Sequence, residues 1–145
     1  KIKNSSKFNQ GFATTEYLAA AFLDMSWHTI TEPISIDANT FENNSMKTIG
    51  LIPEIKPRYR STYFNHIFSG GYSAGYYSYL WAEVLDADAF AAFEETGDVF
   101  NPELANKLRK YVLSSGGTED AMGLYKKFRG SEPGIGPLLE RRGLN

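Results

Sequence analysis

Apolar residues recur at helical spacing through most of the chain, and prolines and glycines separate the expected elements. Residues 14–30 combine strong helix formers with apolar side chains three to four positions apart, which predicts a helix. Pro33 ends it, because the residue before a proline avoids helical torsions. Thr14 or Thr15 is the expected cap, and the expected apolar face carries Leu18, Phe22, Met25 and Thr29.

The next elements are shorter. Asp37 is a suitable N-cap for a second helix, over residues 38–49, and Gly50 stops it. Two prolines among charged residues make residues 53–60 an extended connector. Residues 60–64 are a weak strand candidate.

The longest predicted helix starts near Ser73 or Ala74 and ends close to Thr96. In a helix starting that early, aromatic and acidic side chains at intervals of four and three would share one face. These side chains are Tyr72, Tyr76, Tyr79, Glu83 and Asp86. A neighbouring face, with Leu80, Val84, Ala87 and Ala91, is expected to pack.

Three more helices follow. Asn101, followed by a proline and a glutamate, is a clear start signal, and a pair of glycines ends this helix. Residues 118–120 start another helix, and residues 137–142 form the last one. Because no convincing period-2 strand is found, the predicted fold class is all-α, in a single helical domain over residues 1–145.

Composition narrows the possible partners. Of the 145 residues, 42% are hydrophobic and 22% are charged, with a net charge of −2, as in ordinary folded proteins. No polybasic segment predicts nucleic-acid binding. The longest apolar run is interrupted by Asp24, so no membrane segment is expected. Without cysteine, disulfides and zinc–thiolate sites are excluded.

The first residues, KIKNSSKFNQGF, include neither an initiator Met nor a signal-peptide pattern. We therefore interpret the chain as an excised segment of a longer protein. Its compartment, cytoplasmic or periplasmic, is left unassigned.

Residues 66–81, HIFSGGYSAGYYSYLW, hold the candidate chemistry. They place His66 and four tyrosines around three glycines. Phenols and imidazole can donate hydrogen bonds to a developing oxyanion, and glycines let a loop close over a ligand. We interpret this segment as the substrate-facing part of an active site, although an aromatic stripe at helical spacing is more often core.

Other sites are disfavoured. Gly70, Gly71 and Gly75 are not followed by the Lys-Ser/Thr pair of a phosphate loop. His28, four residues before Glu32, is interpreted as structural. With two histidines and no His-Glu-x-x-His segment, a self-contained catalytic zinc site is not expected, and no G-x-S-x-G elbow anchors a serine triad.

Three long blocks nevertheless carry a resemblance. They are FNQGFATTEYLAAAFLDMSWH, YRSTYFNHIFSGGYSAGYYSYLWAEVLDADAFAAFEETG and KLRKYVLSSGGTEDAMGLYKKFRGSEPGIGPLLERRGL. They resemble, in order, the C-terminal substrate-binding region of the thimet oligopeptidase superfamily of zinc metallopeptidases. The most similar branch is that of the bacterial peptidyl-dipeptidases (dipeptidyl carboxypeptidases) and oligopeptidase A. Only residues 30–44 match poorly.

The resemblance implies a larger, monomeric parent enzyme that hydrolyses short peptides. In that family an HExxH helix and a later glutamate bind zinc, and both precede the region matched here. Zinc is thus expected in the parent and none on this chain, which should be inactive alone. Its partners would be short peptides and the missing N-terminal portion of the same protein.

The resemblance also implies residue roles. Tyr79 would donate its hydroxyl toward the scissile carbonyl, and Tyr72 and His66 would help orient the peptide. Tyr76 is a further substrate contact. The flexible substrate-binding loop would contain Gly70, Gly71 and Gly75.

Two alternatives stay open from the residues alone. The chain could be an autonomous all-α interaction module without catalytic ancestry, whose tyrosine stripe forms a partner groove. For a peptidase, dipeptide release and internal cleavage are both compatible with the sequence.

Overall fold

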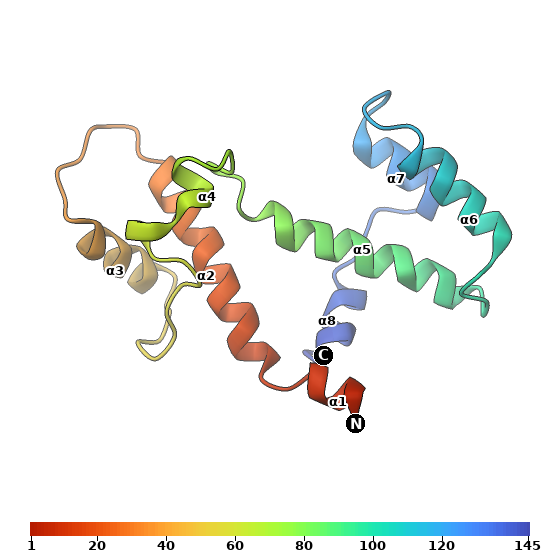
Figure 1. Cartoon of the computed structure of the whole chain (residues 1–145), viewed down its shortest axis with the longest axis horizontal. Coiled ribbons are helices and arrows are strands. Elements are labelled where there is room, and N and C mark those ends of the chain that lie inside the picture. Colours follow the sequence, from red (N-terminus) through yellow and green to blue (C-terminus); the bar gives the residue numbers. More distant parts are fainter. The chain divides into compact units, whose positions relative to one another are not determined.

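The chain consists of helices and connecting loops. The computed structural model describes the backbone of residues 1–145 and every side chain except those of Ile2 and Lys3. This part of the chain contains eight α-helices and no strand, so the all-α prediction is confirmed (Figure 1). The helices are α1 (Ile2–Ser6), α2 (Gln10–His28), α3 (Ala38–Thr48), α4 (Asn65–Phe68), α5 (Ser78–Glu95), α6 (Pro102–Leu108), α7 (Ala121–Arg129) and α8 (Gly136–Arg142).

The chain divides into two compact units, Lys1–Leu80 and Trp81–Asn145. The predicted single domain over residues 1–145 stays a prediction. Among the helices whose residues are described, none is long and apolar enough to cross a bilayer.

Helix α2 is the main helix of the first unit, but it differs from the prediction at its start and in its buried face. It begins at Gln10, and Thr15 donates its hydroxyl to Gly11 O inside the helix instead of capping it. Phe22 and Met25, expected inside, are 49% and 38% exposed. The buried side instead carries three alanines, which allow close packing, together with Leu23 and Asp24.

Helix α3 packs against α2 and matches its prediction. The Asp37 carboxylate accepts the Thr40 N–H at 3.0 Å, which caps the helix as expected. The strand candidate at residues 60–64 is wrong. Ser61–Tyr63 forms a short 3₁₀ helix, η1, because the buried Glu42 carboxylate accepts hydrogen bonds from both the backbone N–H and the hydroxyl of Ser61.

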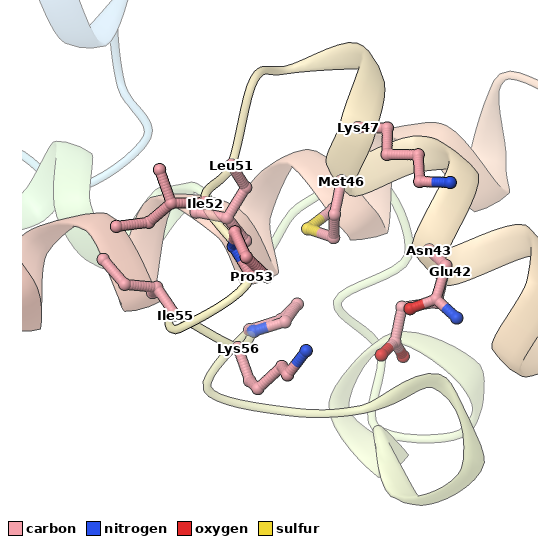
Figure 2. A pocket seen from close by; sticks show the side chains of 10 residues that line it. Glu42, Asn43, Met46, Lys47, Leu51, Ile52, Pro53, Ile55 and Lys56 are labelled. Atoms are coloured by element: carbon pink, nitrogen blue, oxygen red, sulfur yellow. The ribbon is translucent and has the colours of Figure 1, made fainter.

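A cavity of about 380 Å³ lies beside α3. Figure 2 shows side chains of α3 on one side of it and those of the connector on the other. The α3 side includes Met46 and Lys47, and the other side includes Ile52, just before the connector, and Ile55 within it. No tyrosine lines this cavity, so it is separate from the predicted chemistry.

The second unit is built around α5, α6 and α7, with a π-helical turn, η2 (Arg109–Leu113), continuing α6. The predicted Asn101 cap is present and accepts the Leu104 N–H, and within the predicted start at residues 118–120 the cap is Asp120, which accepts the Gly123 N–H. The core of this unit contains Ala92, Tyr125 and Phe128. A buried carboxylate, Asp88, accepts a hydrogen bond of 2.7 Å from the Tyr125 hydroxyl.

Candidate functional site

The glycine-rich loop, residues 69–77, joins α4 to α5. The predicted helix start at Ser73 or Ala74 is wrong, because residues 73–77 form turns and α5 begins at Ser78. Ala74 has φ +54°, in the left-handed region, where an L-residue cannot continue an α-helix.

The predicted helical stripe is therefore also wrong. Tyr72 and Tyr76 precede α5 and do not lie on its face. The acidic side chains of the predicted stripe form ion pairs instead. Asp86 pairs with Arg141 at 2.7 Å, and Glu83 pairs with Arg142. Both ion pairs lie within the second unit, and the Arg142 side chain is partly buried.

Two glycines give the loop its shape. A Cβ at Gly70 would lie 2.8 Å from the Cα of His66 and 2.9 Å from its carbonyl oxygen, closer than real Cβ contacts come. Gly71 has φ +83°, which side chains rarely adopt. At Gly75 the nearest atom would be 3.5 Å away, an ordinary contact. The tight chain path thus requires glycine at positions 70 and 71 more than at 75.

The loop brings all four predicted aromatic site residues together. We call His66, Tyr72, Tyr76 and Tyr79 the tyrosine cluster. The ring centroids of Tyr72 and Tyr79 are 4.9 Å apart, and those of Tyr76 and Tyr79 are 5.5 Å apart. The His66 ring lies 6.2 Å from Tyr72, 5.7 Å from Tyr76 and 6.5 Å from Tyr79. A turn, not a helix face, assembles them.

Exposure differs across the cluster. Tyr79 is 38% exposed, whereas Tyr76 is only 3% exposed and belongs to the core of the first unit. The Tyr76 ring stacks on Tyr17 of α2 at 5.3 Å. The prediction that Tyr76 contacts a substrate stays a prediction, and its burial means that the loop would have to open first.

Hydrogen bonding raises the pKa of the exposed phenol. A side-chain hydrogen bond with Tyr72, followed by desolvation, raises the pKa of Tyr79 from 10.0 to about 12. For Tyr76, burial is the first cause of a raised pKa, with neighbouring Tyr17 adding to it. Both hydroxyls are therefore protonated at neutral pH, and Tyr79 can act there as a hydrogen-bond donor.

The His66 side chain is surrounded by aromatic rings. Its centroid lies 4.7 Å from that of Tyr59, a residue the sequence reasoning did not connect with the cluster. His66 Nδ1 is buried and has no hydrogen-bond partner among the described residues. Buried polar atoms are nearly always paired, so this exception calls for an explanation.

Asp24 is a second residue that the sequence reasoning missed. It is fully buried in α2 and accepts the backbone N–H groups of Ala74 and Tyr76, both at 2.9 Å. His28 lies beside it, with Nδ1 2.7 Å from Asp24 Oδ1, so its ion-pair partner is Asp24 and not the suggested Glu32. The structural interpretation of His28 stays a prediction. The available signal was an acid inside the apolar run AAAFLDMSW.

The described residues do not offer a complete set of metal ligands. Across the described side chains, no group of three or more His, Cys, Asp or Glu is placed to bind a metal ion. The nearest approach, His28 with Asp24, gives two ligands, and the Asp24 oxygens already accept N–H groups. The residues present therefore do not fit a catalytic metal.

Comparison with known proteins defines the class. The sequence model of Peptidase family M3 matches residues 1–144, and the chain belongs to this family of metallopeptidases. Dipeptidyl carboxypeptidase of Escherichia coli (strain K12) is 44% identical over the whole chain. Oligopeptidase A of the same organism is 56% identical over 56% of the chain, and the probable cytosolic oligopeptidase A of Arabidopsis thaliana is 38% identical over 99%.

The predicted family resemblance is thus confirmed, and a module without catalytic ancestry is excluded. The chain matches only part of the length of each relative. The chain spans 21% of the E. coli dipeptidyl carboxypeptidase, 12% of oligopeptidase A and 21% of the Arabidopsis protein.

Proposed function

We propose that this chain is the C-terminal, substrate-binding part of a family M3 peptidase that hydrolyses short peptides. The observation that carries the proposal is the hydrogen-bonded Tyr72–Tyr79 pair, with rings 4.9 Å apart beside a glycine-rich loop. Relatives named dipeptidyl carboxypeptidase and oligopeptidase A support this type of activity. Zinc would be the cofactor of the complete enzyme, bound by the N-terminal portion with which this chain would associate.

Tyr79 is the proposed oxyanion donor. As negative charge develops on the scissile carbonyl oxygen, a neutral phenol can donate a hydrogen bond to it without giving up its proton. Tyr79 is protonated at neutral pH, as any phenol is, and its one hydroxyl proton would turn from Tyr72 to the substrate oxygen. Tyr72 fixes the Tyr79 hydroxyl and, with His66, orients the peptide. Gly70, Gly71 and Gly75 let the loop approach the peptide backbone.

The substitution Tyr79→Phe in the full-length enzyme tests this role. It removes the hydroxyl and keeps the ring that packs against Tyr72 and Tyr76. Loss of one oxyanion donor lowers kcat by about 100- to 1,000-fold. We expect a fall of this order with a much smaller change in KM, measured by steady-state hydrolysis of a short peptide with product masses identified.

Tyr77→Phe is the matched control. Tyr77 lies two positions away and is 55% exposed, so it carries the same chemical change outside the tyrosine cluster. We expect its kcat to stay near the wild-type value. A Tyr79→Phe enzyme with kcat within about twofold of wild type would remove Tyr79 from the chemistry.

A further inference from the structure

The Asp24 carboxylate connects α2 to the glycine-rich loop. Oδ1 accepts the N–H of Ala74, and Oδ2 accepts the N–H of Tyr76, although these residues lie 50 and 52 positions further along the chain. Asp24 is fully buried. Hydrogen bonds to a charged acceptor are stronger than neutral ones, and a buried carboxylate requires such partners.

The two N–H groups lie where the loop is most constrained. Ala74 adopts φ +54°, which is unfavourable for any residue with a Cβ, so surrounding contacts have to maintain it. The hydrogen bonds that Ala74 and Tyr76 donate to Asp24 hold the turn at both of these residues. They also fix the Tyr76 backbone, and hence the ring that lies 5.5 Å from Tyr79 and 5.7 Å from His66.

His28 supports the carboxylate from its own helix. Its Nδ1 lies 2.7 Å from Asp24 Oδ1 and 2.9 Å from the Asp24 carbonyl oxygen. Each carboxylate oxygen of Asp24 therefore has a nitrogen neighbour at hydrogen-bonding distance. His28 thus contacts the carboxylate oxygen that also accepts the Ala74 N–H.

We infer that Asp24 is a positioning residue: it anchors the glycine-rich loop in the conformation that assembles the tyrosine cluster. It touches the loop backbone and acts on the chemistry only through Tyr76 and its neighbours. The anchoring itself stands on the structure, while its consequence for catalysis rests on the proposed function.

Amide hydrogen exchange on the 145-residue chain tests the anchoring without any activity. In Asp24→Asn, an NH₂ group replaces one carboxylate oxygen. One of the two backbone N–H groups, that of Ala74 or that of Tyr76, therefore loses its acceptor. We expect the Ala74 and Tyr76 amides to exchange about tenfold faster or more, as for the loss of a charge-assisted hydrogen bond. The Phe41 amide, inside α3, should keep its wild-type rate.

Glu42→Gln is the matched control. Glu42 is also a buried carboxylate of the first unit, 2% exposed, and it accepts the N–H of Ser61 at 2.8 Å. This variant should speed exchange at Ser61 and leave Ala74 and Tyr76 unchanged. Unchanged exchange at Ala74 and Tyr76 in Asp24→Asn, or an equal increase there in Glu42→Gln, overturns the inference.

A double variant keeps the test decisive if Asp24→Asn is poorly folded. Ala74→Gly removes the Cβ that makes φ +54° unfavourable, so the loop depends less on its anchor. We expect Ala74→Gly to restore part of the Tyr76 protection in the Asp24→Asn background. No restoration in a folded double variant contradicts the inference.

In the full-length enzyme, Asp24→Asn should lower kcat at least tenfold with a smaller change in KM, and Glu42→Gln should not. A normal kcat despite faster loop exchange would overturn the positioning role in catalysis. If the wild-type enzyme cleaves no peptide, the proposed function fails, while the exchange result still decides the anchoring by itself.

Discussion

At the residue scale, the Tyr72–Tyr79 pair is chemically asymmetric. The Tyr79 phenol has a raised pKa, with the hydrogen bond to Tyr72 as its first cause. Because the folded-state pKa lies above the ordinary 10.0, the stabilisation from this bond is complete below pH 10 and is lost as the pH rises toward 12. The donor is therefore intact over the whole neutral range.

Tyr72→Phe tests this coupling directly. It removes the hydroxyl that raises the Tyr79 pKa, so Tyr79 should titrate closer to 10.0 than in the wild type. Carbon-13 NMR of the tyrosine Cζ atoms measures this. At pH 10, Tyr79 should be almost wholly protonated in the wild type and ionised to at most about half in Tyr72→Phe. Equal ionisation in the two proteins would show that Tyr72 does not set the Tyr79 pKa.

The residue types of the site could be read from the sequence, because phenols, imidazole and glycines in one short segment already indicate their chemistry. How buried each of these residues is could not be read from the sequence. Tyr76 and Tyr79 belong to the same segment, yet one is 3% and the other 38% exposed. That difference comes from Tyr17 and Asp24 on α2, which pair with Tyr76 across more than 50 residues of sequence.

At the element scale, the glycine-rich loop depends on the space around its backbone. Gly70→Ala would place a Cβ 2.8 Å from the Cα of His66, and backbone cannot move away as a flexible side chain could. We expect a loss of about 1–3 kcal/mol in the free energy of unfolding, as for overpacking. Urea unfolding followed by circular dichroism measures it.

Gly75→Ala is the comparison within the same loop. Its Cβ would meet Tyr72 O at 3.5 Å, an ordinary contact, and its φ lies outside the left-handed region. A Gly-to-Ala change at such a position is neutral or stabilises by up to about 1 kcal/mol, because the unfolded chain loses freedom. Equal unfolding midpoints for the two variants would show that the close approach at Gly70 is not maintained in solution.

Helix boundaries set by local chemistry were predicted well, and those set by distant contacts were not. Asp37 and Asn101 cap helices as expected, and Asp120 caps the helix predicted to start at residues 118–120; each accepts an N–H three residues ahead. The start of α5 was misplaced by four to five residues because Asp24 holds Ala74 in a turn. Periodicity alone cannot reveal an acceptor 50 residues away.

At the scale of the whole molecule, each unit is organised around buried carboxylates. In the first unit, Asp24 accepts loop N–H groups and Glu42 accepts the N–H of Ser61. In the second, Asp88 is 3% exposed and accepts bonds from Tyr125 and Arg129. Removing one partner of such a network is costly, so these acids fix loop and helix positions more than they contribute net stability.

These acids are dispersed, and this decides what the chain can do alone. Among the described residues no three potential ligands gather at one place, and the carboxylates just named already have hydrogen-bond partners. We therefore expect the 145-residue chain, with zinc added, to cleave no short peptide, whereas the full-length enzyme cleaves it and loses activity when a chelator removes the metal. Mass spectrometry of the products measures both. Cleavage by the isolated chain that a chelator abolishes would mean that these residues bind a catalytic metal after all.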